Sequence, residues 1–170
     1  MNTIGSHPGA ILFRMSIMVT LIAILVVVFF VYVGNVQQNT ERAAIIRTKG
    51  LIDSSLAIVF ATYAVESRLD ELSDLEGANP FEFLREYIAL PDTYQGEVET
   101  GLGSQFAPGW YYLTKPRQVA YKSRYLDHDL RFRLVVNYED RNGSGRYEAD
   151  ADKFGGIYFT PITGTETIRP

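Results

Sequence analysis

The sequence contains no cysteine. This absence excludes disulfide bonds, cysteine-ligated metal centres and thiol catalysis, but it does not identify a compartment, because an exported domain can fold without disulfides. Proline is absent between Pro8 and Pro80, so a long helix can form there without interruption. The sequence also has no phosphate-binding glycine loop, nucleophile elbow or paired-histidine zinc motif. We therefore expect a protein that is not an enzyme.

Charge is absent from Met15 to Val33, a run of nineteen mostly apolar residues. About 20 apolar residues suffice to cross the hydrocarbon core of a bilayer. A cleaved signal peptide has a shorter apolar region with a small-residue cleavage site, whereas this run ends in aromatic residues and continues into a helical pattern. We expect residues 15–33 to be a retained transmembrane helix that follows a short leader-like segment, residues 1–14. The flanking Lys and Arg residues do not decide its orientation, because long domains translocate largely regardless of flanking charge.

Beyond this run the apolar pattern remains helical. Ile45, Ile52, Leu56, Val59 and Tyr63 are spaced as one face of a helix. We therefore expect residues 34–67 to continue the helix and to bury this face. The alternative is a juxtamembrane coiled coil, for which the heptad pattern is short and irregular.

Residues 68–170 suffice for one small domain. Twelve Lys and Arg against seventeen Asp and Glu give this part a net charge of −5, so general affinity for nucleic acid or anionic lipid is not expected. Proline in the first turn and proline after the end predict a short helix over Pro80–Leu90. The glycine-rich stretch between Gly96 and Gly109 is expected to be irregular.

Alternating apolar and polar residues then predict strands. The expected strands are Trp110–Thr114, Gln118–Tyr125, Leu130–Glu139 and Ile157–Pro161. Their apolar face is expected to carry Trp110, Tyr112, Val119, Tyr121, Phe132, Leu134 and Val136. This face needs a cover, and the apolar face of the long helix is the large one available. The expected fold class is therefore α+β: a long N-terminal helix, membrane-spanning in its first half, packed on a small antiparallel β-sheet.

This layout resembles that of type IV pilins and pseudopilins. Pilins carry a short leader ending in glycine, then Phe-Thr-Leu-Ile-Glu and an apolar run; here Gly9 is followed by Ala10-Ile11-Leu12-Phe13-Arg14 and the run from Met15. The segment from Asn35 to Ala44 looks like the pilin helix where it leaves the membrane. Pro108-Gly109-Trp110-Tyr111-Tyr112-Leu113, followed by Val119-Ala120-Tyr121, is similar to a strand pair in pilin-like proteins of the mannose-sensitive haemagglutinin (MSHA) pilus.

The resemblance implies a pilin-like accessory or minor subunit in the assembly of an MSHA-type pilus or a related secretion filament. It implies a single-pass protein of the bacterial inner membrane with its C-terminal domain in the periplasm. The implied partners are other pilin-like subunits and inner-membrane assembly proteins. Arg14 stands where the family has a glutamate that neutralises a neighbouring subunit's N-terminal amine. Because an arginine would repel that amine, we expect retention of the first nine residues and a place outside the filament shaft.

The sharpest polar cluster predicts a calcium loop, because ligand-type residues recur with EF-hand-like spacing around a glycine at the sixth position. The candidate ligands are Asp140, Asn142, Ser144, the carbonyl of Arg146, Glu148, Asp150 and Asp152. The twelfth position is Ala151, which cannot ligate, so Asp150 or Asp152 would have to supply the closing carboxylate. The alternative is a solvated acidic turn built on Asn142-Gly143.

Three weaker patterns remain. Six basic residues between Lys115 and Arg133 are interleaved with Tyr121, Tyr125 and Phe132, which suits either single-stranded nucleic acid or the exposed face of strands; alternation favours strands. His128 lies between Asp127 and Asp129, a candidate metal trio in a turn where adjacent side chains diverge. Nine acidic residues between Asp70 and Glu99 suit docking on the basic stretch of another copy's C-terminal domain, residues 68–170, which we call the head. The second functional class is a membrane-tethered periplasmic sensor or ligand-binding module.

Overall fold

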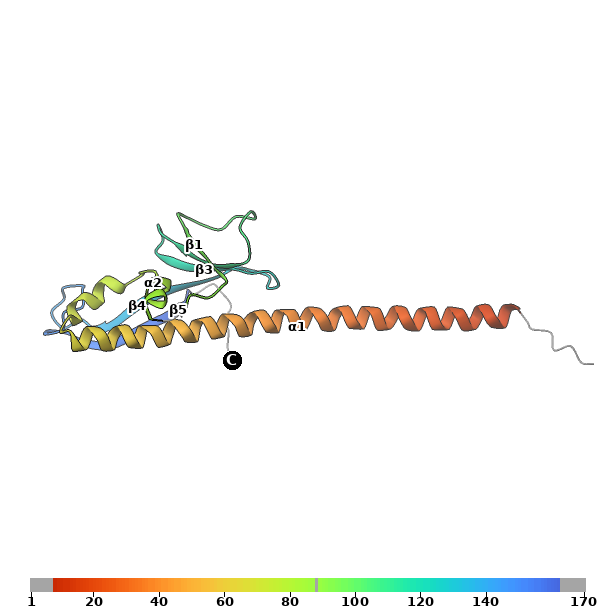
Figure 1. The fold of residues 1–170 in the computed structure, drawn as a ribbon, viewed down its shortest axis with the longest axis horizontal. Helices are drawn as coiled ribbons and strands as arrows, with labels where there is room; N and C mark the ends of the chain where they lie inside the picture. The colour runs from red at the N-terminus through yellow and green to blue at the C-terminus, as the bar shows by residue number, and fades with distance from the viewer. Residues whose placement is uncertain (1–7, 88, 163–170) are drawn as a thin grey trace, which may run out of the picture. The chain divides into compact units, whose positions relative to one another are not determined.

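The structure is a computed structural model that describes residues 8–87 and 89–162. Its elements are α1 (Pro8–Val65), the 3-10 helix η1 (Leu69–Leu75), α2 (Pro80–Tyr87), β1 (Tyr94–Val98), β2 (Gly109–Leu113), β3 (Gln118–Lys122), β4 (Leu130–Glu139) and β5 (Lys153–Pro161) (Figure 1). The expected α+β class, with a long helix packed on a sheet, is confirmed. The chain forms two compact units, one up to Glu41 and one from Arg42 onward, and α1 contributes to both. The expected segments 1–14, 15–33, 34–67 and 68–170 stay predictions.

The part of α1 that belongs to the second unit buries the face that the sequence predicts. Ile45, Ile52, Leu56 and Val59 are each exposed by 2% or less, and Tyr63 packs against the same core with partial burial. These side chains recur every three, four or seven residues, so they share one side of the helix. The sheet therefore packs on one continuous stripe of α1.

α1 ends in a C-cap without glycine. The N–H of Arg68 donates to the carbonyl of Tyr63 at 2.8 Å, and the N–H of Ser67 donates to that of Ala64 at 3.4 Å. This is the Schellman arrangement, whose penultimate residue adopts a left-handed conformation. Ser67 has a φ of 60°, so a serine occupies a position that glycine would fill without steric cost.

The sheet has five strands in the order β1-β2-β3-β4-β5. β2 to β5 form the expected antiparallel meander. β1 was not expected, and it pairs with β2 in parallel, so the sheet is mostly rather than wholly antiparallel. Its five residues include Gly96, which has a φ of 109° and lies where the pairing with β2 is irregular. Because the strand is short and interrupted, its sequence shows little alternation of apolar and polar residues.

β5 begins at Lys153, earlier than the expected start at Ile157. The pairing shifts where Asn137 faces Gly156 while Tyr138 faces Phe154, which leaves Gly155 as an extra residue. Gly156 has a φ of 125°, a conformation that few residues other than glycine adopt. This bulge breaks the alternation of apolar residues and hides the first part of the strand from pattern analysis.

The core lies between the α1 stripe and one face of the sheet. All seven residues expected on the apolar sheet face belong to it: Trp110, Tyr112, Val119, Tyr121, Phe132, Leu134 and Val136. Trp110 is 1% exposed and packs among aromatic rings, with centroids at 4.9 Å for Tyr121, 5.5 Å for Phe132 and 6.0 Å for Phe81. Phe81 comes from α2, so this helix closes the core beside the sheet.

The segment between η1 and α2 connects these elements to the sheet. The N–H of Gly77 donates to the carbonyl of Leu134 at 2.8 Å, and the hydroxyl of Tyr112 donates to the carbonyl of Gly77 at 2.7 Å. Asn79 caps α2, because its side-chain oxygen accepts the N–H of Phe81 at 3.1 Å. Its amide nitrogen donates to Glu97 of β1 at 2.8 Å, which ties the cap to the sheet edge.

Candidate functional site

The first part of α1 is long and apolar enough to cross a membrane. The large apolar side chains from Leu12 to Tyr32 have exposed fractions between 46% and 68%, and none of the most apolar window is buried within the protein. Monomeric soluble proteins rarely expose contiguous apolar surface on this scale. Within it, the hydroxyl of Thr20 donates to the carbonyl of Ser16 at 2.9 Å, so this polar group has a partner inside the helix. The geometry therefore suits a single-pass anchor.

The predicted calcium loop lies between β4 and β5 and is ordered around Asp140. One carboxylate oxygen of Asp140 accepts the N–H groups of Gly143 at 2.7 Å and Ser144 at 3.2 Å, and the other accepts that of Gly145 at 2.9 Å. These donors, with that of Gly145 contributing most, hold the pKa of Asp140 below its ordinary value of 3.8. Gly143 and Gly145 both have a φ of 73°, which lets the backbone wrap around the carboxylate.

The other candidate ligands also bond within the loop. Asp152 accepts the N–H of Arg141 at 3.0 Å and that of Glu148 at 3.0 Å. Glu148 accepts the side-chain amide of Asn142 at 2.7 Å, and the hydroxyl of Ser144 donates to the carbonyl of Arg146 at 2.9 Å. The side chains that the spacing selects as ligands thus form the internal hydrogen bonds of the loop, while no such bond is observed for the carboxylate of Asp150.

Within residues 8–87 and 89–162, no group of three or more His, Cys, Asp or Glu side chains is placed to hold a metal ion. This holds for the loop from Asp140 to Asp152 and for the trio around His128. In that trio, Asp129 instead accepts the ammonium of Lys122 at 3.1 Å and the N–H of Ser123 at 3.1 Å. Calcium binding by the loop stays a prediction, and the geometry adds no support to it.

Of the three aromatic residues interleaved in the basic stretch, two are buried and Tyr125 is 36% exposed. Tyr121 and Phe132 lie in the core at 7% and 4% exposure, so they are not available to stack on bases. Arg131 and Arg133 lie on the exposed face of β4, as strand alternation requires. Arg133 lies 3.4 Å from Glu76, and Lys115 lies 2.6 Å from Glu99. The arrangement matches the exposed face of strands.

The acidic stretch meets the 140–152 loop of its own head. Asp70 of η1 accepts the N–H of Ala149 at 2.6 Å, and Asp74 lies 3.5 Å from the guanidinium of Arg146. Tyr147 is 5% exposed beside this contact; burial raises its pKa, and the carboxylates of Asp70 and Asp152 raise it further. The sequence alone did not pair η1 with this loop, because the partners are more than seventy residues apart.

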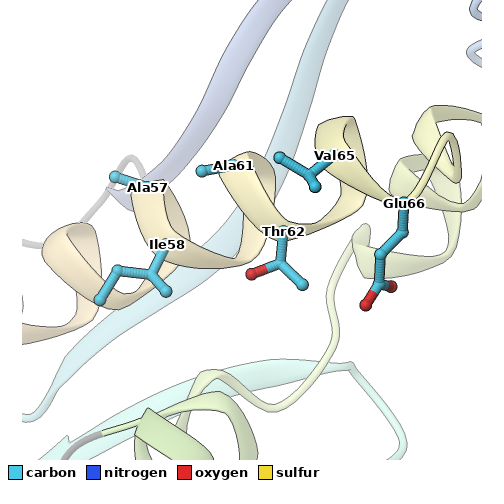
Figure 2. A pocket seen from close by; sticks show the side chains of 6 residues that line it. All are labelled: Ala57, Ile58, Ala61, Thr62, Val65 and Glu66. Carbon is cyan, nitrogen blue, oxygen red and sulfur yellow. The ribbon is translucent and has the colours of Figure 1, made fainter.

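A second apolar face of α1 has no cover within the described chain. A shallow recess of about 510 Å³ follows Ala57, Ile58, Ala61, Thr62, Val65 and Glu66, whose side chains are shown in Figure 2. Ile58 is 41% exposed and Val65 86%. Both are apolar, but they lie outside the stripe of Ile52, Leu56 and Val59 that packs on the sheet.

Comparison with known proteins gives no relative: no protein-family model, no curated protein and no solved structure matches this chain.

Proposed function

We propose that the chain is a pilin-like accessory or minor subunit in the assembly of a type IV pilus of the MSHA type, or of a related secretion filament. Among the proteins of that pilus it most resembles the biogenesis accessory protein labelled F. It would reside in the bacterial inner membrane as a single-pass protein with its sheet domain in the periplasm. Its partners would be other pilin-like subunits and inner-membrane assembly proteins.

The observation that carries the proposal is the double use of α1. One helix, Pro8–Val65, contains an exposed apolar segment in its first part and the buried stripe of a sheet domain in its last part. A helix satisfies its backbone hydrogen bonds internally, so it can pass from hydrocarbon to water without a break. The use of one helix both as membrane anchor and as part of the domain core supports a pilin-like subunit. A receptor domain joined to its anchor by a separate linker would not need this arrangement.

Arg14 supports the accessory role. It precedes the apolar run, and any arrangement that brings the N-terminal amine of another subunit to this position would bring two positive charges together. We expect the first nine residues to be retained; they fall largely outside the described residues, which begin at Pro8. Mass spectrometry of the native N-terminus tests this, and mature chains beginning at Ala10 in sheared filaments would contradict it.

The function itself is tested by deleting the gene in its own bacterium and counting surface pili by electron microscopy. Complementation with the full chain should restore them, whereas Val26→Arg should not, because an arginine at the centre of a membrane helix costs about 2.5–3.5 kcal/mol on insertion scales. Gln37→Arg, beyond the apolar run, is the matched control and should complement. Normal piliation in the deletion strain would favour the alternative, a membrane-tethered ligand-binding or sensor module.

A further inference from the structure

A cleft of about 440 Å³ lies where η1, the β2–β3 turn, β4 and the 140–152 loop meet. All of these segments belong to the unit that begins at Arg42. The cleft is lined by Val135, Val136, Tyr138, Gly145 and Tyr147 and by the polar residues Ser73, Glu76, Arg117 and Arg146. It therefore combines an apolar and aromatic surface with two guanidinium groups from segments far apart in the sequence.

Arg117 occupies this cleft at a backbone position that does not suit it. Its φ is 52°, a left-handed conformation that glycine and asparagine adopt easily and that larger residues rarely adopt. Its side chain runs beside Gly77, where an added Cβ would lie 3.1 Å from the Cβ of Arg117. Among the described residues, no carboxylate forms an ion pair with Arg117. A left-handed position is costly for a residue as large as arginine, and such strained positions cluster at functional sites.

Arg146 is the second cation, and its present partner holds it weakly. The guanidinium lies 3.5 Å from Asp74, and the two side chains are 74% and 71% exposed. An ion pair this exposed contributes little, so a better partner can replace Asp74. The negative charge inside the cleft is already engaged: Glu76 accepts the N–H of Val136 at 2.7 Å and lies 3.4 Å from Arg133.

We propose that this cleft binds a single carboxylate side chain on an extended segment of a partner protein, held by Arg117 and Arg146. Guanidinium groups match carboxylate and phosphate oxygens in a two-bond geometry. The head as a whole carries a net charge of −5, which disfavours a polyanion such as nucleic acid. An isolated carboxylate on a peptide avoids that repulsion, and the apolar surface of Val135 and Tyr138 can pack against the residue beside it.

The test mixes the full chain in zwitterionic detergent with a fluorescently labelled peptide that carries one carboxylate, acetyl-Gly-Gly-Glu-Phe-Gly-amide, and measures fluorescence polarisation at low salt. We expect saturable binding, with the Gln counterpart of the peptide at least tenfold weaker. Arg117→Gln and Arg146→Gln should each weaken binding by about tenfold, as loss of a charge-assisted hydrogen bond does. Arg85→Gln, an exposed change on α2 with the same loss of charge, should leave the affinity unchanged.

A second variant separates binding from folding. Arg117→Gly removes the guanidinium but suits a φ of 52°, so it should weaken binding as much as Arg117→Gln does and should also raise the melting temperature. Failure of the Glu peptide to saturate, equal binding of the Gln peptide, or an equal loss in Arg85→Gln would overturn the proposal. Displacement of the Glu peptide by inorganic phosphate at concentrations below the peptide's own dissociation constant would overturn the assignment to a carboxylate.

Discussion

Two isoleucines of the same helix give the sharpest test of how the sheet packs on α1. Ile52 is 0% exposed and belongs to the core, whereas Ile58 is 41% exposed and lies on the second face, along the recess in Figure 2. Changing each to alanine removes the same atoms from the same helix. The gain in helix propensity, a few tenths of a kcal/mol, is common to both changes and cancels in the comparison.

The expected magnitudes differ severalfold. Truncating a fully buried isoleucine typically costs about 2–5 kcal/mol, because the lost apolar contacts leave a cavity. Ile58 already exposes much of its side chain, so Ile58→Ala should cost less than about 1 kcal/mol. For a unit of this size, Ile52→Ala should lower the melting temperature by on the order of 10 °C, and Ile58→Ala by no more than a few degrees.

The assay is thermal unfolding of the full chain in detergent micelles, followed by near-ultraviolet circular dichroism, which reports the environment of the aromatic core around Trp110. Denaturant titration of both variants supplies the free energies independently of temperature. Equal destabilisation by the two changes would refute the assignment of Ile52 to the packed face and Ile58 to the exposed face.

Four further outcomes follow from the backbone and the loop. Gly50→Ala should raise the free energy of unfolding by about 0.5–1 kcal/mol in denaturant titration, because Gly50 lies within α1 with open space around an added Cβ. Gly109→Ala should lower it, because Gly109 has a φ of 148° and an added Cβ would lie 2.5 Å from the carbonyl oxygen of Thr93. Ser67→Gly should raise the melting temperature by a few degrees by relieving the left-handed C-cap. Because the pKa of Asp140 is lowered in the folded state, its loop contacts are fully present above pH 3.8 and are lost as pH falls through the folded-state pKa. The amide resonance of Gly145 should shift in that pH range, and Asp140→Asn should abolish the shift. Millimolar calcium should raise the melting temperature relative to chelator if the loop binds the ion, and no shift in the unmutated chain would contradict that prediction.

The parts of the fold that repeat with a regular period were predictable from sequence. Spacing along α1 identified Ile45 to Val59 as the buried stripe, and alternation along β4 identified Phe132, Leu134 and Val136. Both inferences rest on geometry that every helix or strand shares, so they do not depend on what lies across the interface. Proline in the first turn predicted the start of α2 at Pro80, whereas the helix ends at Tyr87 rather than at the expected Leu90.

The parts that depend on irregular backbone were not predictable. β1 and the first half of β5 contain glycines at positive φ, which break the alternation that marks a strand. The loop from Asp140 to Asp152 presented ligand-type residues at alternate positions, but a carboxylate that accepts backbone N–H groups leaves the same sequence pattern as one that binds an ion. Spacing selects which oxygens are available, and the fold decides which donor each of them meets.

The cleft lined by Arg117 and Arg146 was also not predictable from the sequence. Arg117 follows Pro116 in a tight turn, and nothing in its neighbours along the chain signals that it will lie in a cleft with Arg146. Both line one cleft because η1 and Gly77 cover the part of β4 that β3 leaves unpaired. The carbonyl of Leu134 accepts the N–H of Gly77, and Glu76 accepts that of Val136. That cover brings the turn and the loop to one place, so the cleft is a product of how the edge of a strand is protected. A surface of this kind can therefore vary in its charges while the sheet beneath it stays the same. The bonds that build the cleft come mainly from the backbone, Glu76 and Asp70, and Arg146 adds only its exposed ion pair with Asp74.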